Sequence, residues 1–161
     1  YYWLIEYDVR FNGDWKNYFE FFADKDDDFI SAHIGDFSGD TRWTRWKEIE
    51  LVNIKLNHKM LLRSFNPICR ISNRALALGH ERCKLGDRGH YEVLLPTLFK
   101  YFKLKISDFG GNGRFIYTGC SGLFYTDDPN DVCGDKCTHR FRPAHTEGEM
   151  ALSGMIYHPV K

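Results

Sequence analysis

The first ten residues of the chain, Tyr1 to Arg10, constrain its fold more than any other stretch. The apolar run 1–5 leads directly into two carboxylates, Glu6 and Asp8, which are one residue apart. Such a run predicts a strand that is buried on both faces. In open α/β sheets ligands bind outside the carboxyl ends of the strands, and a carboxylate pair there suits a hard divalent cation. The alternative is that the two acids end the strand without binding a cation and are either solvated or paired with Arg10.

The overall composition favours a single globular α/β domain that spans residues 1–161. A chain of 161 residues can bury about two-thirds of its surface on folding. Its 22 basic and 22 acidic side chains cancel, so no overall field attracts nucleic acid or an anionic membrane. No apolar run reaches the roughly 20 residues that a membrane helix needs, and no signal peptide is recognisable. We therefore expect no nucleic-acid partner and no membrane segment in this chain.

The first residues bear on whether another segment precedes them, and the cysteines bear on the redox compartment. Residues 1–5 can be buried in mid-sheet only if other strands flank them, so we expect an upstream segment or domain, unless this strand is an edge. The chain has five cysteines, an odd number that mildly favours a reducing compartment. We expect a cytoplasmic location, with the lumen of the secretory pathway as the alternative.

Periodicity and capping residues predict alternating helices and strands. Asp14 and Ser72 are candidate N-caps of two of the helices. The acidic run 24–28 is expected to be a solvated loop, with a second cation site as the less favoured interpretation. The segment 118–149 is longer than most ordered loops, so it is either a lid or tied down. The expected helices are 15–23, 57–65, 73–78 and 93–103, and the expected strands are 1–5, 29–34, 68–72, 104–109, 115–117 and 151–157.

Two groups of side chains in the middle of the chain are candidate binding residues. Trp43 and Trp46 can form an aromatic wall for an acceptor sugar, or they can fill the edge of the core. Arg70 and Arg74 can reach a diphosphate, or they can be surface charges beside a helix cap.

Glu92 stands at the start of the predicted helix 93–103, after a glycine-containing loop and His90. The positive end of the helix dipole favours an ionised carboxylate at that place, and an ionised carboxylate is what a general base needs. We therefore expect Glu92 to be catalytic and His90 to be a substrate-binding neighbour.

A third group of candidate residues could bind zinc, because thiolate and imidazole are suitable zinc ligands. The spacing matches no common zinc pattern, and a disulfide between Cys133 and Cys137 is an equal alternative. The candidate ligands of this structural zinc site are Cys120, Cys133, Cys137 and His139, with His145 nearby.

Short stretches spread along most of the chain resemble GT-A glycosyltransferases. They are 3–11 (WLIEYDVRF), 70–76 (RISNRAL), 89–97 (GHYEVLLPT) and 157–161 (YHPVK). The first resembles the acid-x-acid motif of that family, with Glu6 where many members have Asp. The resemblance implies a mixed sheet flanked by helices, the later half of a GT-A fold, with the upstream nucleotide-binding part missing. It also implies a nucleotide-sugar donor and a carbohydrate acceptor.

In the same family a late histidine can join the acid motif at the metal, which implies that Glu6, Asp8 and His158 share one cation. Pro159 would fix the direction of His158, although a histidine near a terminus is more commonly a surface residue. An imidazole ligand favours Mn²⁺ over Mg²⁺. The leading hypothesis is a metal-dependent glycosyltransferase. The alternatives are a non-catalytic carbohydrate-binding or structural module and a zinc-stabilised interaction domain.

Overall fold

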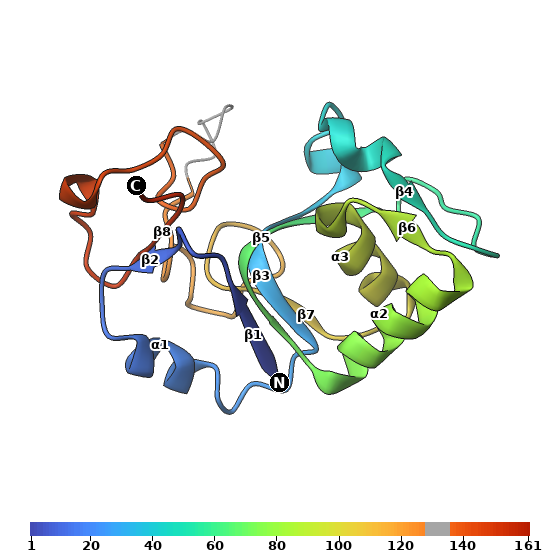
Figure 1. Cartoon of the computed structure of the whole chain (residues 1–161), viewed down its shortest axis with the longest axis horizontal. Coiled ribbons are helices and arrows are strands. Elements are labelled where there is room, and N and C mark those ends of the chain that lie inside the picture. Colours follow the sequence, from blue (N-terminus) through green and yellow to red (C-terminus); the bar gives the residue numbers. More distant parts are fainter. Residues whose placement is uncertain (128–135) are drawn as a thin grey trace. The chain divides into compact units, whose positions relative to one another are not determined.

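The computed structural model describes residues 1–127 and 136–161, and in this part the chain is an α/β protein with a mixed sheet and three α-helices (Figure 1). The helices are α1 (Trp15–Phe21), α2 (Asn73–Leu85) and α3 (Tyr91–Tyr101). The strands are β1 (Tyr2–Ile5), β2 (Arg10–Phe11), β3 (Phe29–Asp36), β4 (Ile49–Glu50), β5 (Leu62–Ile71), β6 (Arg88–Gly89), β7 (Ile106–Asp108) and β8 (Ile156–Tyr157).

Contacts divide the chain into two compact units, each built from two separate stretches. Unit 1 comprises Tyr1–Leu4 and Asp27–Asp108, and unit 2 comprises Ile5–Asp26 and Phe109–Lys161. Each unit has buried residues of its own, and the single domain expected from the sequence stays a prediction.

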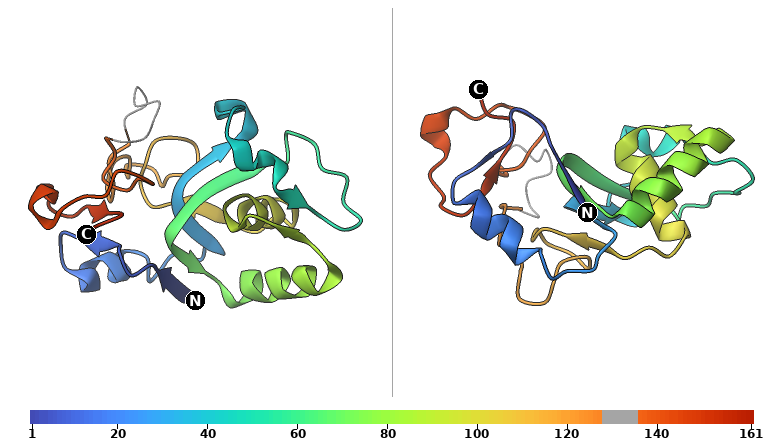
Figure 2. Two further views of the ribbon diagram at one scale, coloured as in Figure 1. Left: turned by 45° about the horizontal axis from the view of Figure 1, so that its top comes forward. Right: turned by 60° about the horizontal axis from the view of Figure 1, so that its bottom comes forward.

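Unit 1 is built on a sheet with the strand order β1-β5-β3-β7. Strand β3 is antiparallel to β5 and parallel to β7. The helices α2 and α3 lie on the same side of this sheet (Figure 2). Their apolar residues pack with those of β3 and β5 in one buried cluster, which includes Phe29, Cys69, Ile71, Ala75, Leu94, Leu98 and Phe99.

Strand β1 is an edge of the sheet, which corrects the expectation of a strand buried on both faces. Tyr1, Tyr2, Leu4 and Ile5 are all more than two-fifths exposed. An apolar run is compatible with either position, because its periodicity does not reveal how many neighbouring strands the sheet supplies.

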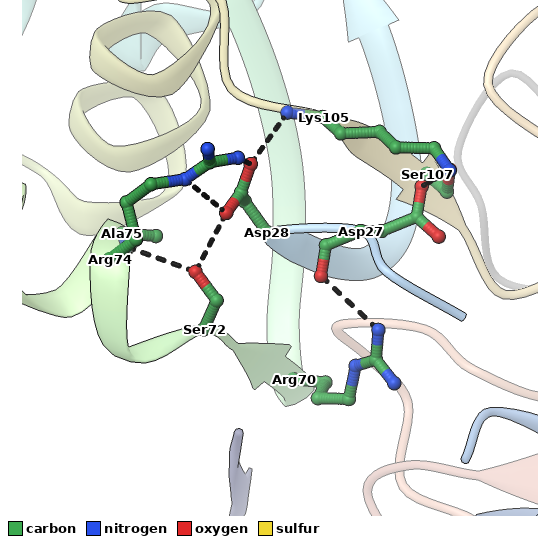
Figure 3. Close-up of polar contacts among 8 residues, drawn as sticks. All are labelled: Asp27, Asp28, Arg70, Ser72, Arg74, Ala75, Lys105 and Ser107. Atoms are coloured by element: carbon green, nitrogen blue, oxygen red, sulfur yellow. Dashed lines mark hydrogen bonds and ion pairs between the residues drawn. The ribbon is translucent and has the colours of Figure 1, made fainter. Parts of the chain in front are cut away.

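Two acids of the run 24–28 are buried, so the expectation of a solvated loop is wrong for them. Asp27 and Asp28 are 0% and 2% exposed. Asp28 accepts hydrogen bonds from Ser72 Oγ at 2.8 Å and from the backbone N–H of Lys105 at 2.9 Å, and it forms an ion pair with Arg74 (Figure 3). One carboxylate thus connects the start of β3, the N-cap of α2 and the approach to β7.

Other observed elements also differ from the predicted ones. Residues 57–65 are not a helix, because β5 begins at Leu62 and continues through Pro67 to Ile71. Pro67 cannot donate a hydrogen bond to a neighbouring strand, so a strand tolerates it best at an irregularity. The β3/β5 register shifts here, because Ile30 pairs with Arg70 and Ala32 pairs with Phe65. Residues 115–117 form no strand, and only Ile156–Tyr157 of the predicted strand 151–157 pairs. The predicted N-caps of α1 and α2 are confirmed.

Unit 2 contains α1, the short β2–β8 pair and an aromatic core around Tyr18. The ring of Tyr18 contacts those of Phe11, Phe22, Phe109 and Phe124, with centroids 4.8 to 5.9 Å apart. The described parts of the segment 118–149 are tied to the last strand. The N–H of Ile156 donates to Phe124 O at 2.7 Å, and the N–H of His158 donates to Thr138 O at 3.0 Å.

Candidate metal site

The pairing of β2 with β8 brings the two ends of unit 2 together. The strands are antiparallel with Arg10 opposite Tyr157, so residues before Arg10 lie beside residues after Tyr157. The backbone N–H of Val160 donates to the carbonyl of Asp8 at 2.9 Å, which continues this contact beyond the strands. A tight turn follows β1, in which the N–H of Val9 donates to Glu6 O at 3.1 Å.

The structure places His158 beside both carboxylates, as expected from the sequence. Its Nε2 lies 3.6 Å from Glu6 Oε2 and 3.6 Å from Asp8 Oδ1. One ligand atom from each of the three residues lies within 4.8 Å of the others, and no other group of three such ligands occurs in residues 1–127 and 136–161. The side chains of Glu6, Asp8 and His158 are 48%, 16% and 7% exposed. The site is therefore anchored on its buried side and open at Glu6.

A backbone carbonyl orients the imidazole of His158. Its Nδ1 lies 2.7 Å from the carbonyl oxygen of Arg140, so Nδ1 carries a proton and donates it. In the neutral ring, the lone pair of Nε2 then faces the two carboxylates. Histidines that bind metals typically donate their other N–H in this way, because the bond selects the tautomer and holds the ring.

The carboxylate of Asp8 has an unusual environment that fits a cation. Its Oδ1 is buried and has no hydrogen-bond partner in the described part of the chain. The 3.6 Å separation from His158 is longer than a hydrogen bond, which spans about 2.7–3.2 Å. Two ligand atoms roughly 2.1 Å from one ion at a tetrahedral angle lie about 3.4 Å apart. The donor set therefore fits a divalent ion, and a protonated imidazole is the competing way to compensate both acids.

Glu92, the predicted general base, lies in the first turn of α3, where it was expected. The Nδ1 of His90, the N-cap residue, accepts a hydrogen bond from the N–H of Glu92 at 3.4 Å. Burial, and after it the positive charge of Arg45, lowers the pKa of His90, so this ring is neutral near pH 7 and suited to accept. The side chain of Glu92 is 12% exposed.

His90 also borders a pocket of unit 1. The pocket has a volume of about 380 Å³ and is open to solvent. Its lining carries charges of both signs, so it suits a polar ligand better than an apolar one. The lining residues are Lys47, Glu48, Ile49, Glu50, Arg88, Gly89 and His90.

Both arginines predicted to contact a diphosphate have partners inside unit 1. Arg70 is 2% exposed, donates to the carbonyl oxygen of Asp27 at 3.1 Å, and its guanidinium lies 4.1 Å from the ring centroid of Tyr1. Arg74 pairs with Asp28 (Figure 3). These contacts favour the structural interpretation of both residues, and diphosphate binding by them stays a prediction.

The two tryptophans of the predicted acceptor wall differ in position. Trp46 is 6% exposed, packs against Leu61 and Val93, and donates from Nε1 to the carbonyl oxygen of Asp40 at 2.7 Å. Trp43 is partly exposed and packs edge-on against Trp46, with centroids 4.8 Å apart. Trp46 is thus a core residue, whereas Trp43 is only partly buried.

The proposed zinc ligands are only partly described. Cys133 lies outside the described residues, so neither the disulfide nor the zinc prediction is tested at that position. Cys120 is partly exposed, whereas Cys137 and His139 are 3% and 0% exposed. The ring of His139 lies 5.6 Å from that of His158, measured between centroids.

Two residues that hold the candidate metal site in place are not recognisable from the sequence. Arg140 and Val160 contribute through their backbone groups, so their side chains give no signal for these roles. The strands β2 and β8 that bring these groups together have only two residues each, which is too short to predict pairing from the sequence.

Comparisons of the chain with protein-family models, with curated proteins and with solved structures found no match. In the described residues, no helix is long and apolar enough to cross a membrane.

Proposed function

We propose that the protein is a metal-dependent glycosyltransferase that moves a sugar from a nucleotide-sugar to a hydroxyl group of a glycan or another acceptor. The observation that carries the proposal is the convergence of Glu6, Asp8 and His158, in which Asp8 Oδ1 is buried without a hydrogen-bond partner among the described residues. A carboxylate pair repels a diphosphate unless a cation lies between them, so this donor set suits metal-assisted diphosphate chemistry.

The three residues would hold the ion in different ways. Asp8 and His158 are the rigid ligands, because the backbone of Asp8 is bound to Val160 and the ring of His158 is bound to Arg140. Glu6 is half exposed and can move toward a ligand that enters from solvent. A divalent cation bound there would neutralise charge on the departing diphosphate.

Glu92 is the proposed general base for the acceptor hydroxyl. Its place in the first turn of α3 favours a carboxylate charge there, because the helix dipole is positive at that end. Its side chain is largely shielded from water, which favours proton transfer from a bound hydroxyl to the carboxylate over exchange with solvent.

Binding of Mn²⁺ tests the metal site directly. We expect calorimetric titration of the whole chain to show one Mn²⁺ site whose affinity increases when uridine diphosphate or guanosine diphosphate is present. Asp8→Ala should weaken Mn²⁺ binding by roughly 100-fold or more, because it removes the buried ligand. Glu147→Ala changes an exposed acid of unit 2 and is the matched control.

Hydrolysis of the donor tests the reaction. With Mn²⁺, the wild type should slowly release the sugar from at least one of UDP-glucose, UDP-N-acetylglucosamine and GDP-mannose, and Asp8→Ala should not. Wild-type protein that binds neither Mn²⁺ nor a nucleoside diphosphate would contradict the proposal. Metal binding without any turnover would favour the non-catalytic carbohydrate-binding module instead.

A further inference from the structure

The pocket of unit 1 lies where the paired strands β4 and β6 meet the start of α3. The backbone N–H of His90 donates to the carbonyl oxygen of Glu48 at 2.9 Å. A Cβ on Gly89 would lie 2.2 Å from the same oxygen, so only glycine allows the two strands to approach this closely. Backbone contacts therefore fix the wall of the pocket, and side chains supply its charges.

Both acids that line the pocket already have arginine partners. Arg88 donates to Glu50 Oε2 from Nε at 2.9 Å and from Nη2 at 2.7 Å. Arg45 Nη1 lies 2.9 Å from Glu48 Oε2. The third cation is Lys47, whose ammonium group has no ion pair or hydrogen bond in the part of the chain that the structure describes. The two acids are thus compensated, and the charge of Lys47 is in excess.

The ring of His90 adds a second donor to the pocket. Its Nδ1 accepts the N–H of Glu92 at 3.4 Å, and Glu92 Oε2 lies 3.6 Å from the same nitrogen, which is beyond hydrogen-bonding distance. The proton of the neutral ring is therefore on Nε2, which has no hydrogen-bond partner among the described residues. Burial, and after it the charge of Arg45, lowers the pKa of His90 and keeps the ring neutral near pH 7.

The unpartnered groups of the pocket match a carboxylate better than other ligands. Both are hydrogen-bond donors, and one of them is a cation, so an uncharged ligand would leave Lys47 uncompensated. A carboxylate offers two acceptor oxygens and the one negative charge that balances the ammonium group. A phosphate monoester carries about 1.5 to 2 negative charges at pH 7, which exceeds the single charge available. The volume of about 380 Å³ lies in the range of small-molecule sites.

We propose that this pocket binds a small ligand through a single carboxylate group, which pairs with Lys47 and accepts a hydrogen bond from His90 Nε2. The side chain of Ile49 is the apolar part of the lining and contacts the body of the ligand. The pocket is open to solvent, and exposed ion pairs contribute little free energy, so the affinity is in the millimolar range.

This inference goes beyond the proposed function, because binding in the pocket needs neither a metal nor a transfer reaction. The candidate metal ligands belong to unit 2, whereas every residue that lines the pocket belongs to unit 1. The two proposals therefore fail independently. A protein that binds a carboxylate but neither Mn²⁺ nor a nucleoside diphosphate would refute the transferase alone.

NMR titration of the whole chain tests the pocket, with lactate, glucuronate and galacturonate as probes. Glucose and galactose are the matched sugars without a carboxylate, and glucose 6-phosphate is the phosphate comparison. We expect at least one carboxylate to shift the ring resonances of His90. That carboxylate should bind at least fivefold more tightly than the uncharged sugars and more tightly than glucose 6-phosphate.

Two variants examine the donors separately. Lys47→Ala should weaken carboxylate binding at least fivefold, whereas Lys84→Ala, which changes an exposed lysine of α2, should not. His90→Asp retains a side-chain acceptor for the N-cap of α3 but adds a negative charge to the pocket. It should abolish carboxylate binding and still unfold cooperatively. Lys47→Ala alters an exposed side chain, so it remains decisive if His90→Asp does not fold.

Three results would overturn the proposal. The first is a wild-type protein that binds none of the three carboxylates. The second is tighter binding of glucose 6-phosphate than of every carboxylate, which would show that the pocket selects phosphate. The third is unchanged carboxylate affinity in Lys47→Ala, which would place the bound carboxylate elsewhere on the protein.

Discussion

The backbone N–H of Val160 and the carbonyl oxygen of Asp8 are joined at 2.9 Å, although about 150 residues separate them along the chain. Through this bond the last residues of the chain and the acid-containing turn are held together, so His158 and the two carboxylates share one place in unit 2. The candidate metal site is consequently sensitive to changes at either end of that unit.

Replacing the imidazole should change which metal binds. His158→Ala should weaken Mn²⁺ binding by roughly 10-fold to 100-fold and leave the weaker binding of Mg²⁺ almost unchanged, because Mg²⁺ prefers oxygen ligands. Calorimetric titration with each ion measures the difference. Equal losses for both ions would show that the imidazole positions the carboxylates and does not bind the metal itself.

Removing the proposed base should separate chemistry from binding. In Glu92→Gln we expect transfer to fall by about 100-fold to 10,000-fold while affinity for the nucleoside diphosphate stays within twofold, because only the transition state needs the base. Single-turnover kinetics and calorimetry give the two quantities. Loss of cooperative unfolding in this variant would instead assign Glu92 a structural role at the start of α3.

The buried carboxylate of Asp28 should make stability depend on acid pH. Burial raises the pKa of Asp28, but hydrogen bonds from Arg74, Lys105 and Ser72 together outweigh it and leave that pKa below its ordinary value. A depressed folded-state pKa contributes stability above the unfolded pKa of about 3.9, and this contribution is lost as the pH falls below that value.

Asp28→Asn should therefore lower the free energy of unfolding at pH 7 by about 2 to 3 kcal/mol and flatten its dependence on pH below about 4. Urea denaturation between pH 2.5 and pH 7 measures both effects. Asp24→Asn is the control, because Asp24 is exposed and pairs only with the neighbouring Lys25 in the described structure. An Asp28→Asn profile parallel to that of the wild type would contradict the prediction.

Two glycines of unit 1 should respond to alanine in opposite directions. A Cβ on Gly89 would lie 2.2 Å from the backbone oxygen of Glu48, so Gly89→Ala should separate β4 from β6 and destabilise the protein by about 2 kcal/mol or more. Gly79 lies within α2 with no atom within 4 Å of a new Cβ, so Gly79→Ala should stabilise it by about 0.5 to 1 kcal/mol. Thermal unfolding of both variants measures the contrast.

Local signals in the sequence predicted part of the fold well. Asp14 and Ser72 were recognised as N-caps, and their side chains accept hydrogen bonds from Lys16 N and Ala75 N. The apolar pattern after His90 correctly indicated a helix. Helix caps and helical periodicity depend on residues within one or two turns of each other. Neighbouring residues in the sequence are therefore enough to predict them.

The candidate site, the burial of charged residues and the strand pairing depend on contacts between residues that lie far apart in the sequence. The sequence singled out Glu6 and Asp8 as candidate metal ligands, and the family resemblance added His158, but that the three side chains meet depends on the pairing of β2 with β8. In the same way, the burial of Asp28 depends on Arg74 and Lys105, and the expected helix at 57–65 became part of β5 because β3 lies beside it. The physical reason is that burial and strand pairing depend on which distant segments share the core, whereas capping and helical periodicity act within a few residues.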